Sequence, residues 1–198
     1  MKLPRIILAS ASPRREALLR QLTLDFLVSP TVVQECDHAY LTPREICLLN
    51  AYHKARAGAR QWPDELVLGA DTVVCLGHEL FGKPASLAEA RFTLARLQGR
   101  THEVITGVCL FWARHPRARL FAETTQVTFK QLSPAQIRAY LNKVNALDKA
   151  GAYGIQEHGE MIIQSISGSY SNVVGLPLER LRRELRHFAR RNSRPGGM

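Results

Sequence analysis

Three copies of one helix-start signature divide this chain and constrain most of its secondary structure. A Ser or Thr is followed three residues later by Glu or Gln at Thr42-Pro43-Arg44-Glu45, Ser86-Leu87-Ala88-Glu89 and Ser133-Pro134-Ala135-Gln136. In such a capping box the hydroxyl and the acidic or amide side chain each accept a backbone N–H of the first helical turn. We therefore predict helices from Thr42 to about Arg60, from Ser86 to about Leu97, and from Ser133 to about Asn142.

Runs rich in Val, Ile, Thr and aromatic residues lie between these helices and predict strands. They cover residues 26–29, 66–76, 102–112, 120–129 and 161–166. The third and fourth runs flank a polar turn at 113–119, which predicts a long antiparallel hairpin. Helices alternate with strands, but one strand pair is a hairpin, so we expect an α/β fold with a mixed twisted sheet and flanking helices.

The composition is that of a globular protein. With 198 residues, 45% hydrophobic, the chain can bury a sizeable core, and we expect one domain over 1–189, either undivided or as two lobes around a cleft. The apolar runs are far shorter than the ~20 residues that a membrane span needs. The N-terminal apolar run ends too soon at Arg14-Arg15 for a secretory signal, so we expect a cytoplasmic protein.

Several common site types are absent from the sequence. The four cysteines are widely spaced and the seven histidines have no metal-ligand spacing, which argues against a zinc site or a disulfide framework. We expect reduced, mostly buried cysteines and mostly surface histidines. Neither a P-loop nor the G-x-S-x-G context of a serine hydrolase is present.

Positive charge is concentrated at the C-terminus. The net charge of the chain is +10. Residues 179–198 hold seven Arg and two Glu, so this segment alone carries half of the net charge. Leu178, Leu181, Leu185 and Phe188 recur at helical spacing, so we predict a docked helix with arginines facing water. Residues 190–198 are predicted to be a disordered basic tail, and nucleic-acid binding is not expected because no recognition module accompanies the charge.

Two segments have a chemical and a structural interpretation. Ser10-Ala11-Ser12-Pro13-Arg14-Arg15 predicts a helix start that either cradles phosphate with backbone N–H groups and guanidinium groups or is an ordinary capped surface helix. Asp71 places a carboxylate inside the apolar run 66–74, either to serve a site or to accept backbone hydrogen bonds at a strand end. Gly69, two residues earlier, would let another backbone or a ligand approach closely.

Other segments are weaker signals on their own. Lys83 lies on a tight Gly/Pro loop and is a plausible phosphate contact, whereas Lys54, inside a predicted helix, is expected to face solvent. Residues 148–156 and 168–178 mix small residues, charges and tyrosine, so we predict two loops, the first lining a site.

Six segments together resemble the Maf family, in the order and over nearly the whole length that the family shows. The segments are Ser10–Arg15, Gly69–Thr72, Gly82–Pro84, Gly99–His102, Asp148–Gln156 and Gly168–Leu178. The resemblance implies a fold like that of inosine triphosphate pyrophosphatases. It also implies a house-cleaning enzyme that hydrolyses a nucleoside triphosphate to a monophosphate and pyrophosphate, using Mg²⁺, Mn²⁺ or Co²⁺.

The family's three specificity positions correspond to Arg14, Thr72 and Gln156, a combination similar to the dTTP/UTP branch. The branch acting on 7-methyl-GTP has Trp, Gln and Glu there, and a cationic purine suits an aromatic face and a carboxylate. A Gln156 amide can instead donate to a uracil carbonyl and accept from its N3–H. The resemblance also assigns Ser10, Arg15, Lys54 and Lys83 to substrate binding.

The resemblance makes Asp71 the proton acceptor and also a metal ligand, two roles that compete. Glu35 corresponds to a second acid that helps hold metal. Here the chain departs from the family, which often has two adjacent acids, because Gln34 takes the first position. The sequence leaves Asp37 as an alternative to Glu35, and it leaves open whether the protein forms a homodimer.

Two further functional hypotheses stay open at this stage. One is a different base preference within the family, including 7-methyl-GTP. The other is a nucleic-acid-binding or cell-division regulatory protein that uses the arginine-rich C-terminal helix.

Overall fold

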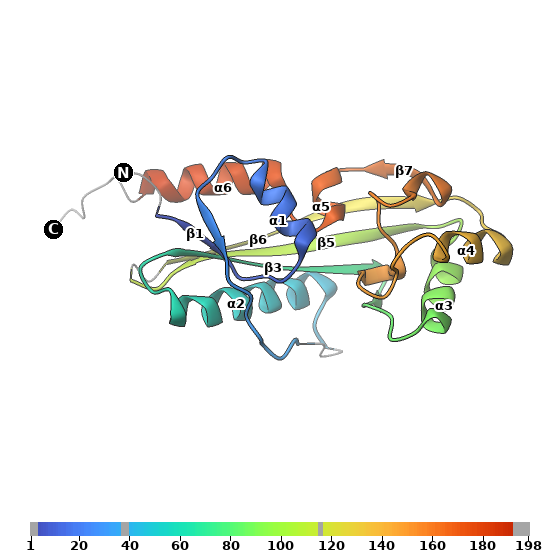
Figure 1. Cartoon of the computed structure of the whole chain (residues 1–198), viewed down its shortest axis with the longest axis horizontal. Coiled ribbons are helices and arrows are strands. Elements are labelled where there is room, and N and C mark those ends of the chain that lie inside the picture. Colours follow the sequence, from blue (N-terminus) through green and yellow to red (C-terminus); the bar gives the residue numbers. More distant parts are fainter. Residues whose placement is uncertain (1–3, 37–39, 115–116, 192–198) are drawn as a thin grey trace. The chain divides into compact units, whose positions relative to one another are not determined.

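A single mixed sheet organises the chain (Figure 1). The computed structural model describes residues 4–36, 40–114 and 117–191. The main path of the sheet runs β2-β1-β3-β5-β6-β7, and β4 pairs with β3. The strands are β1 (Ile6–Leu8), β2 (Phe26–Val28), β3 (Leu66–Leu76), β4 (Glu79–Phe81), β5 (Thr101–Trp112), β6 (Arg117–Phe129) and β7 (Ile163–Ser167).

Both strand directions occur in this sheet. β1 lies parallel to β2 and β3, whereas β4 is antiparallel to β3 and β7 is antiparallel to β6. β5 and β6 are neighbours joined by only four residues, too few for the crossover that parallel strands require. The expected α/β fold with a mixed sheet and the expected hairpin are therefore confirmed.

The helices are α1 (Pro13–Arg20), α2 (Pro43–Gln61), α3 (Leu87–Leu97), α4 (Pro134–Leu141), α5 (Tyr170–Val174) and α6 (Leu178–Arg191), with 3₁₀ turns η1 (Ala150–Ala152) and η2 (Gly159–Met161). The first four begin where the capping signals predict, after Ser12, Thr42, Ser86 and Ser133. Thr42 and Ser133 form complete capping boxes. Ser86 caps the N–H of Glu89, but the Glu89 carboxylate accepts from Ala85 rather than from Ser86.

Several boundary predictions were wrong. Strand β6 begins at Arg117 rather than Leu120, inside the predicted turn at 113–119. The segment 168–178 is not a continuous loop, because Ser169 accepts the Asn172 N–H at 3.2 Å and starts the short helix α5. The last strand begins at Ile163 rather than Met161, since Met161 belongs to η2.

Two compact units share the chain, and β3, β5 and β6 each pass from one to the other. Unit 1 holds the chain up to Asp71, residues 106–123, and the chain from Gly175 onward. In this unit α2 covers one face of the strands, and α1 and α6 lie on the other (Figure 1). The core under α2 is built from Ile7, Ala9, Ala51, Ala55, Ala59, Val67 and Cys109.

Helix α6 docks on unit 1 as its sequence pattern predicts. Leu178, Leu181, Leu185 and Phe188 are all buried, and the arginines at 182, 183 and 186 are exposed. The buried Glu184 carboxylate accepts from Arg119 at 2.6 Å and from Arg180 at 2.9 Å. Helix α6 continues to Arg191, so residues 190 and 191 are helical and not part of a disordered tail as predicted. Residues 192–198, the rest of the predicted tail, lie outside the described residues.

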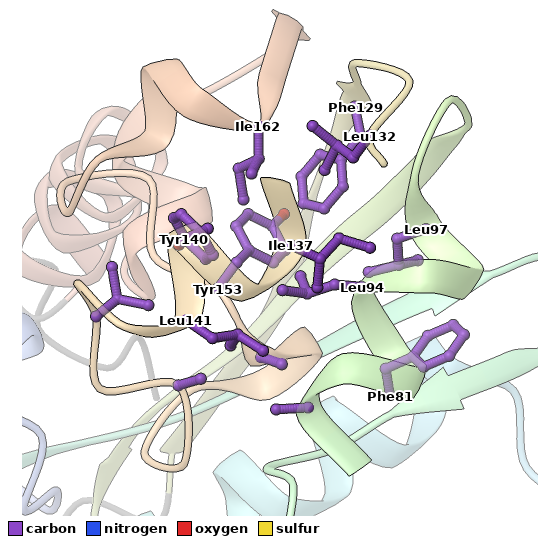
Figure 2. Close-up of a cluster of buried hydrophobic side chains, with 14 of the residues drawn as sticks. Phe81, Leu94, Leu97, Phe129, Leu132, Ile137, Tyr140, Leu141, Tyr153 and Ile162 are labelled. Carbon is purple, nitrogen blue, oxygen red and sulfur yellow. The ribbon is translucent and has the colours of Figure 1, made fainter. Parts of the chain in front are cut away.

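Unit 2 comprises residues 72–105 and 124–174 and has its own core. Side chains from α3, α4, β4, β6 and the segment around η1 meet there (Figure 2). The largest contributors are Phe81, Leu94, Leu97, Phe129, Leu132, Ile137, Tyr140, Leu141, Tyr153 and Ile162.

The expected burial of the cysteines is confirmed, and among the histidines that the structure describes His102 departs from the expected surface position. Cys47, Cys75 and Cys109 are buried, Cys36 is half-buried, and all four are free thiols. His102 is buried beside Tyr153 and Phe129, contrary to a surface position. Across the described ranges, no helix combines the length and the apolar character of a membrane span.

Candidate active site

Two glycines let helix α2 lie directly against the sheet in unit 1. A Cβ atom on Gly69 of β3 would fall 2.3 Å from the Ala51 carbonyl oxygen, and one on Gly107 of β5 would fall 2.4 Å from that of Cys47. Any side chain at either position would therefore push α2 away. The close approach expected at Gly69 is confirmed, and it is the backbone of α2 that approaches.

This seating brings Lys54 of α2 to Asp71 near the middle of β3. The Lys54 ammonium donates to Asp71 Oδ1 at 2.7 Å and to Glu35 Oε1 at 2.6 Å. The Lys54 and Asp71 side chains are 13% and 11% exposed, whereas Glu35 is 61% exposed. A solvent-facing Lys54 is thus the wrong interpretation, and one ammonium instead joins two carboxylates from distant parts of the sequence.

Asn50 is a residue of this cluster that the sequence analysis missed. It is 3% exposed, and its amide nitrogen donates to Asp71 Oδ2 at 3.2 Å. The same side chain accepts from the Cys36 N–H at 2.7 Å and donates to the Cys36 carbonyl at 3.2 Å. Its position in the sequence could have indicated this role, because Asn50 precedes Lys54 by four residues and therefore lies on the same face of the helix.

The Ser10–Arg15 turn is a capped helix start that also holds a guanidinium in place. The Ser12 hydroxyl caps α1 by accepting the Arg15 N–H. The Ser10 hydroxyl accepts from Arg15 Nη1 at 3.2 Å, and Arg15 Nε donates to the Gly175 carbonyl at 2.9 Å. The arginine is therefore oriented by the β1–α1 turn and by the segment before α6.

Charge in this part of unit 1 is balanced between cations and carboxylates. Burial lowers the pKa of Arg15, and the attraction of Asp71 partly opposes this shift. The guanidinium therefore lies within electrostatic range of the carboxylate that Lys54 and Asn50 hold. Ser10, Arg15, Glu35, Lys54 and Asp71 thus belong to one unit, and the neighbouring Arg14 is half-buried at the start of α1.

The remaining predicted site residues belong to unit 2. Thr72 directly follows Asp71 on β3, Lys83 is exposed between β4 and α3, and Gln156 is exposed after η1. The loops that carry Lys83 and Gln156 are tied together, because Gly151 N donates to the Gly82 carbonyl at 3.1 Å. The segment 148–156 is irregular as predicted, with left-handed backbone at Gly151 and Ala152.

The donor set fits a hard divalent cation that also binds substrate. Asp71 and Glu35 bring two carboxylates to one positive charge, and Mg²⁺ is typically held by one or two carboxylates together with substrate phosphates. Within the described ranges no group of three or more His, Cys, Asp or Glu could hold a metal by itself. The alternative acid, Asp37, lies outside those ranges.

The comparisons with known proteins identify the family. Residues 5–188 match the model described as Maf-like protein. The chain belongs to the Maf family. This Maf protein is 45% identical over 184 residues to a dTTP/UTP pyrophosphatase of Bacillus cereus strain AH187, covering 93% of this chain and 95% of that one. It is also 45% identical over 177 residues to a dTTP/UTP pyrophosphatase of Akkermansia muciniphila, covering 89% and 92%.

Solved structures support the fold of this Maf protein. A HAM1 protein from Coxiella burnetii aligns with a TM-score of 0.56 at 18% identity, covering 93% of this chain and 100% of that chain. The Ham1 protein of Staphylococcus aureus aligns with a TM-score of 0.52 at 15% identity, covering 93% and 99%. At such identities the likeness concerns the architecture alone.

Proposed function

We propose that this protein hydrolyses dTTP and UTP, and modified pyrimidine nucleotides, to the monophosphate and pyrophosphate. The proposal draws on the near full-length similarity to dTTP/UTP pyrophosphatases. The observation that carries it is the cluster in which Lys54 joins Asp71 and Glu35, in the same unit as the oriented Arg15. Such a set supplies the cations and carboxylates that phosphoryl transfer requires. We assign this activity to the cytoplasm.

The cationic groups bind the triphosphate in this proposal. The first-turn N–H groups of α1 and the Arg15 guanidinium offer donors to phosphate oxygens. Lys54 and Lys83 add positive charge that offsets the charge growing on the leaving pyrophosphate. The Ser10 hydroxyl keeps the guanidinium directed at the substrate, because it already holds Arg15 Nη1 at 3.2 Å.

Asp71 acts on the attacking water. A water oxygen bonds to the α-phosphorus, the bond from that phosphorus to the bridging oxygen breaks, and pyrophosphate leaves. As Lys54 turns toward the phosphates, Asp71 Oδ1 becomes available to accept the proton of the water, while Asn50 retains Oδ2. A catalytic carboxylate that is anchored on one oxygen keeps the other in a defined direction.

Glu35 and Asp71 are the residues that would hold the divalent cation, Mg²⁺, Mn²⁺ or Co²⁺. The two roles of Asp71 are alternatives: a carboxylate bound directly to the cation is a poor base, so Asp71 would then orient the water instead of accepting its proton. When bound, such a cation neutralises phosphate charge and lowers the pKa of a coordinated water. Glu35 is well suited to exchange Lys54 for a cation because its carboxylate is more than half exposed.

Base selection falls to Arg14, Thr72 and Gln156. The exposed Gln156 amide can donate to a carbonyl of uracil or thymine and accept from N3–H. Arg14 offers donors to a carbonyl or a phosphate and has nothing that favours a cationic purine. Replacing Gln156 by Glu should therefore reduce the preference for dTTP, because a carboxylate cannot donate to a carbonyl.

The experiment is a screen of canonical and modified nucleoside triphosphates with Mg²⁺, Mn²⁺ or Co²⁺, measuring pyrophosphate and orthophosphate separately. We expect pyrophosphate from dTTP and UTP, no turnover after chelation of the metal, and recovery when metal is restored. Orthophosphate alone would contradict cleavage between the α- and β-phosphates. A preference for 7-methyl-GTP would place the protein in the other branch of the family.

A further inference from the structure

An almost fully buried lysine in unit 2 has no part in the chemistry described so far. Lys149 is 4% exposed, and its ammonium has three acceptors: the Asn145 carbonyl at 2.7 Å, Asp148 Oδ1 at 2.8 Å and Glu157 Oε2 at 3.0 Å. Because an ammonium has three N–H donors, all of them are used. Burying a charge is costly even when it is paired, and an apolar side chain of similar size often stabilises a fold at least as well. The charge at Lys149 therefore calls for a role beyond stability.

Two acceptors of Lys149 are the first and last residues of the irregular segment 148–157. Because its ammonium pairs with both Asp148 and Glu157, it joins the two ends of this segment. The aliphatic part of the side chain fills the space between them, since a Cβ atom on Gly154 would lie 2.7 Å from Lys149 Cε. Lys149 is thus the internal support around which the segment folds.

A buried tyrosine holds the same segment from the core of unit 2. The Tyr140 hydroxyl accepts the Gly154 N–H at 3.0 Å and lies 3.4 Å from the Gly154 carbonyl, to which it donates. The neighbouring Tyr153 is buried and shares a hydrogen bond of 2.8 Å with His102 (Figure 2 shows both tyrosines in the core). The backbone is therefore held at residues 153 and 154 by the core and at Glu157 by Lys149.

Gln156 lies between these held positions and is itself exposed. Within the described ranges its amide takes no part in a hydrogen bond. The backbone around Gln156 is thus fixed, while its side-chain amide is available to hydrogen-bond a ligand. This arrangement favours recognition of a base, because little conformational entropy is lost when the base binds.

We propose that Lys149 is a positioning residue for base selection, acting by holding the 148–157 segment so that the Gln156 amide meets the pyrimidine edge in a fixed place. The inference rests on the proposed function of Gln156 as the residue that contacts the base. Lys149 touches neither the phosphates nor the reacting atoms in this role. Its loss should therefore raise KM for dTTP and UTP and leave kcat nearly unchanged.

The test is a double-mutant cycle with Lys149→Met, Gln156→Ala and the double variant, measuring kcat and KM for dTTP, UTP and dCTP. We expect each single change to lower kcat/KM for dTTP by about tenfold, the order of one hydrogen bond to a base. The double variant should be no worse than Gln156→Ala, because coupled residues are not additive. Lys143→Met, an exposed lysine of the same unit, is the matched control and should retain full activity.

The outcomes separate the inference from the function on which it rests. A full additional loss for Lys149→Met in the Gln156→Ala background would overturn the inference and leave the role of Gln156 intact. No effect of Gln156→Ala on kcat/KM would overturn the role of Gln156, and the inference with it. If Lys149→Met does not fold, Tyr140→Phe carries the same cycle, since it removes the two Gly154 hydrogen bonds and keeps the ring in the core.

Discussion

The ammonium of Lys54 lies 2.7 Å from Oδ1 of Asp71, so a cation already sits beside the carboxylate to which the chemistry is assigned. The same ammonium also holds Glu35 at 2.6 Å. Positive charge is thus built into the site before any phosphate or metal arrives. Binding of a triphosphate with its cation then replaces one set of charge contacts by another, rather than burying new charge without compensation.

Asp71→Asn should abolish turnover and preserve the fold. The amide is nearly the same size as the carboxylate but cannot accept a proton or bind a metal strongly, so we expect kcat to fall by about 10²–10⁴-fold, the usual range for a general base. Pyrophosphate release with dTTP and a thermal unfolding curve are the measurements. Asp25→Asn, at an exposed position of the same unit, is the control, and near-normal activity of Asp71→Asn would refute the assignment.

Asn50→Ala should reduce kcat without a comparable change in overall structure. The change removes the donor to Asp71 Oδ2 and both hydrogen bonds to Cys36. Loss of such an outer-shell partner typically costs about 10–100-fold in activity or metal affinity, and the unpaired backbone groups cost about 1–3 kcal/mol of stability. Steady-state kinetics at several metal concentrations measure the loss of kcat and of metal affinity. Asn142→Ala, at an exposed position, is the control. An unchanged kcat and an unchanged metal dependence in Asn50→Ala would mean that Asn50 is only structural.

Arg14→Trp should alter base preference more than it weakens phosphate binding. Arg14 occupies a proposed specificity position, whereas the adjacent Arg15 is oriented by Ser10 and Gly175. The natural comparison is Arg15→Met, which should lower kcat/KM for all nucleoside triphosphates by a similar factor. Ratios of kcat/KM for 7-methyl-GTP over dTTP measure the shift, and equal losses for both substrates in Arg14→Trp would argue against a role in base selection.

His102 should make the protein less stable as the pH falls below about 6.5. Burial lowers the pKa of His102 to about 4, so between its unfolded value near 6.5 and about 4 the unfolded state binds a proton that the folded state does not. Above pH 6.5 the imidazole is neutral in both states and contributes no pH dependence. The free energy of unfolding should therefore decline by on the order of 3 kcal/mol between pH 6.5 and pH 4 through this group.

The His102 effect can be isolated with His102→Gln, which does not titrate in this range. Urea unfolding at pH 7, 6, 5 and 4.5 should give a shallower loss of stability for the variant than for the unmodified protein. Parallel curves for the two proteins would show that His102 is protonated in the folded state or that other groups dominate. His187→Gln, on an exposed position of α6, should leave the slope unchanged.

Much of the secondary structure was predictable because its signals are local. A capping serine or threonine and its partner three residues later interact within one turn, so Thr42, Ser86 and Ser133 locate helix starts without any tertiary contact. The alternation of strands and helices and the predicted polar turn at 113–119 likewise indicate that the sheet is mixed. The α5 helix escaped prediction because a single turn capped by Ser169 has little pattern to detect.

The sequence by itself determined the starts of the capped helices, the mixed character of the sheet and the apolar face by which α6 packs. Through the order of its motifs it also determined the family. Only the tertiary structure decided that Lys54 faces Asp71 rather than water, that Asn50 joins Asp71 to the Glu35–Cys36 segment, and that Lys149 and His102 are buried. These placements depend on where α2 rests on Gly69 and Gly107 and on how unit 2 folds around Tyr140 and Tyr153. Contacts between residues far apart in sequence have no local signature, since a lysine on a helix has the same neighbours in the sequence whether its ammonium meets a carboxylate or solvent.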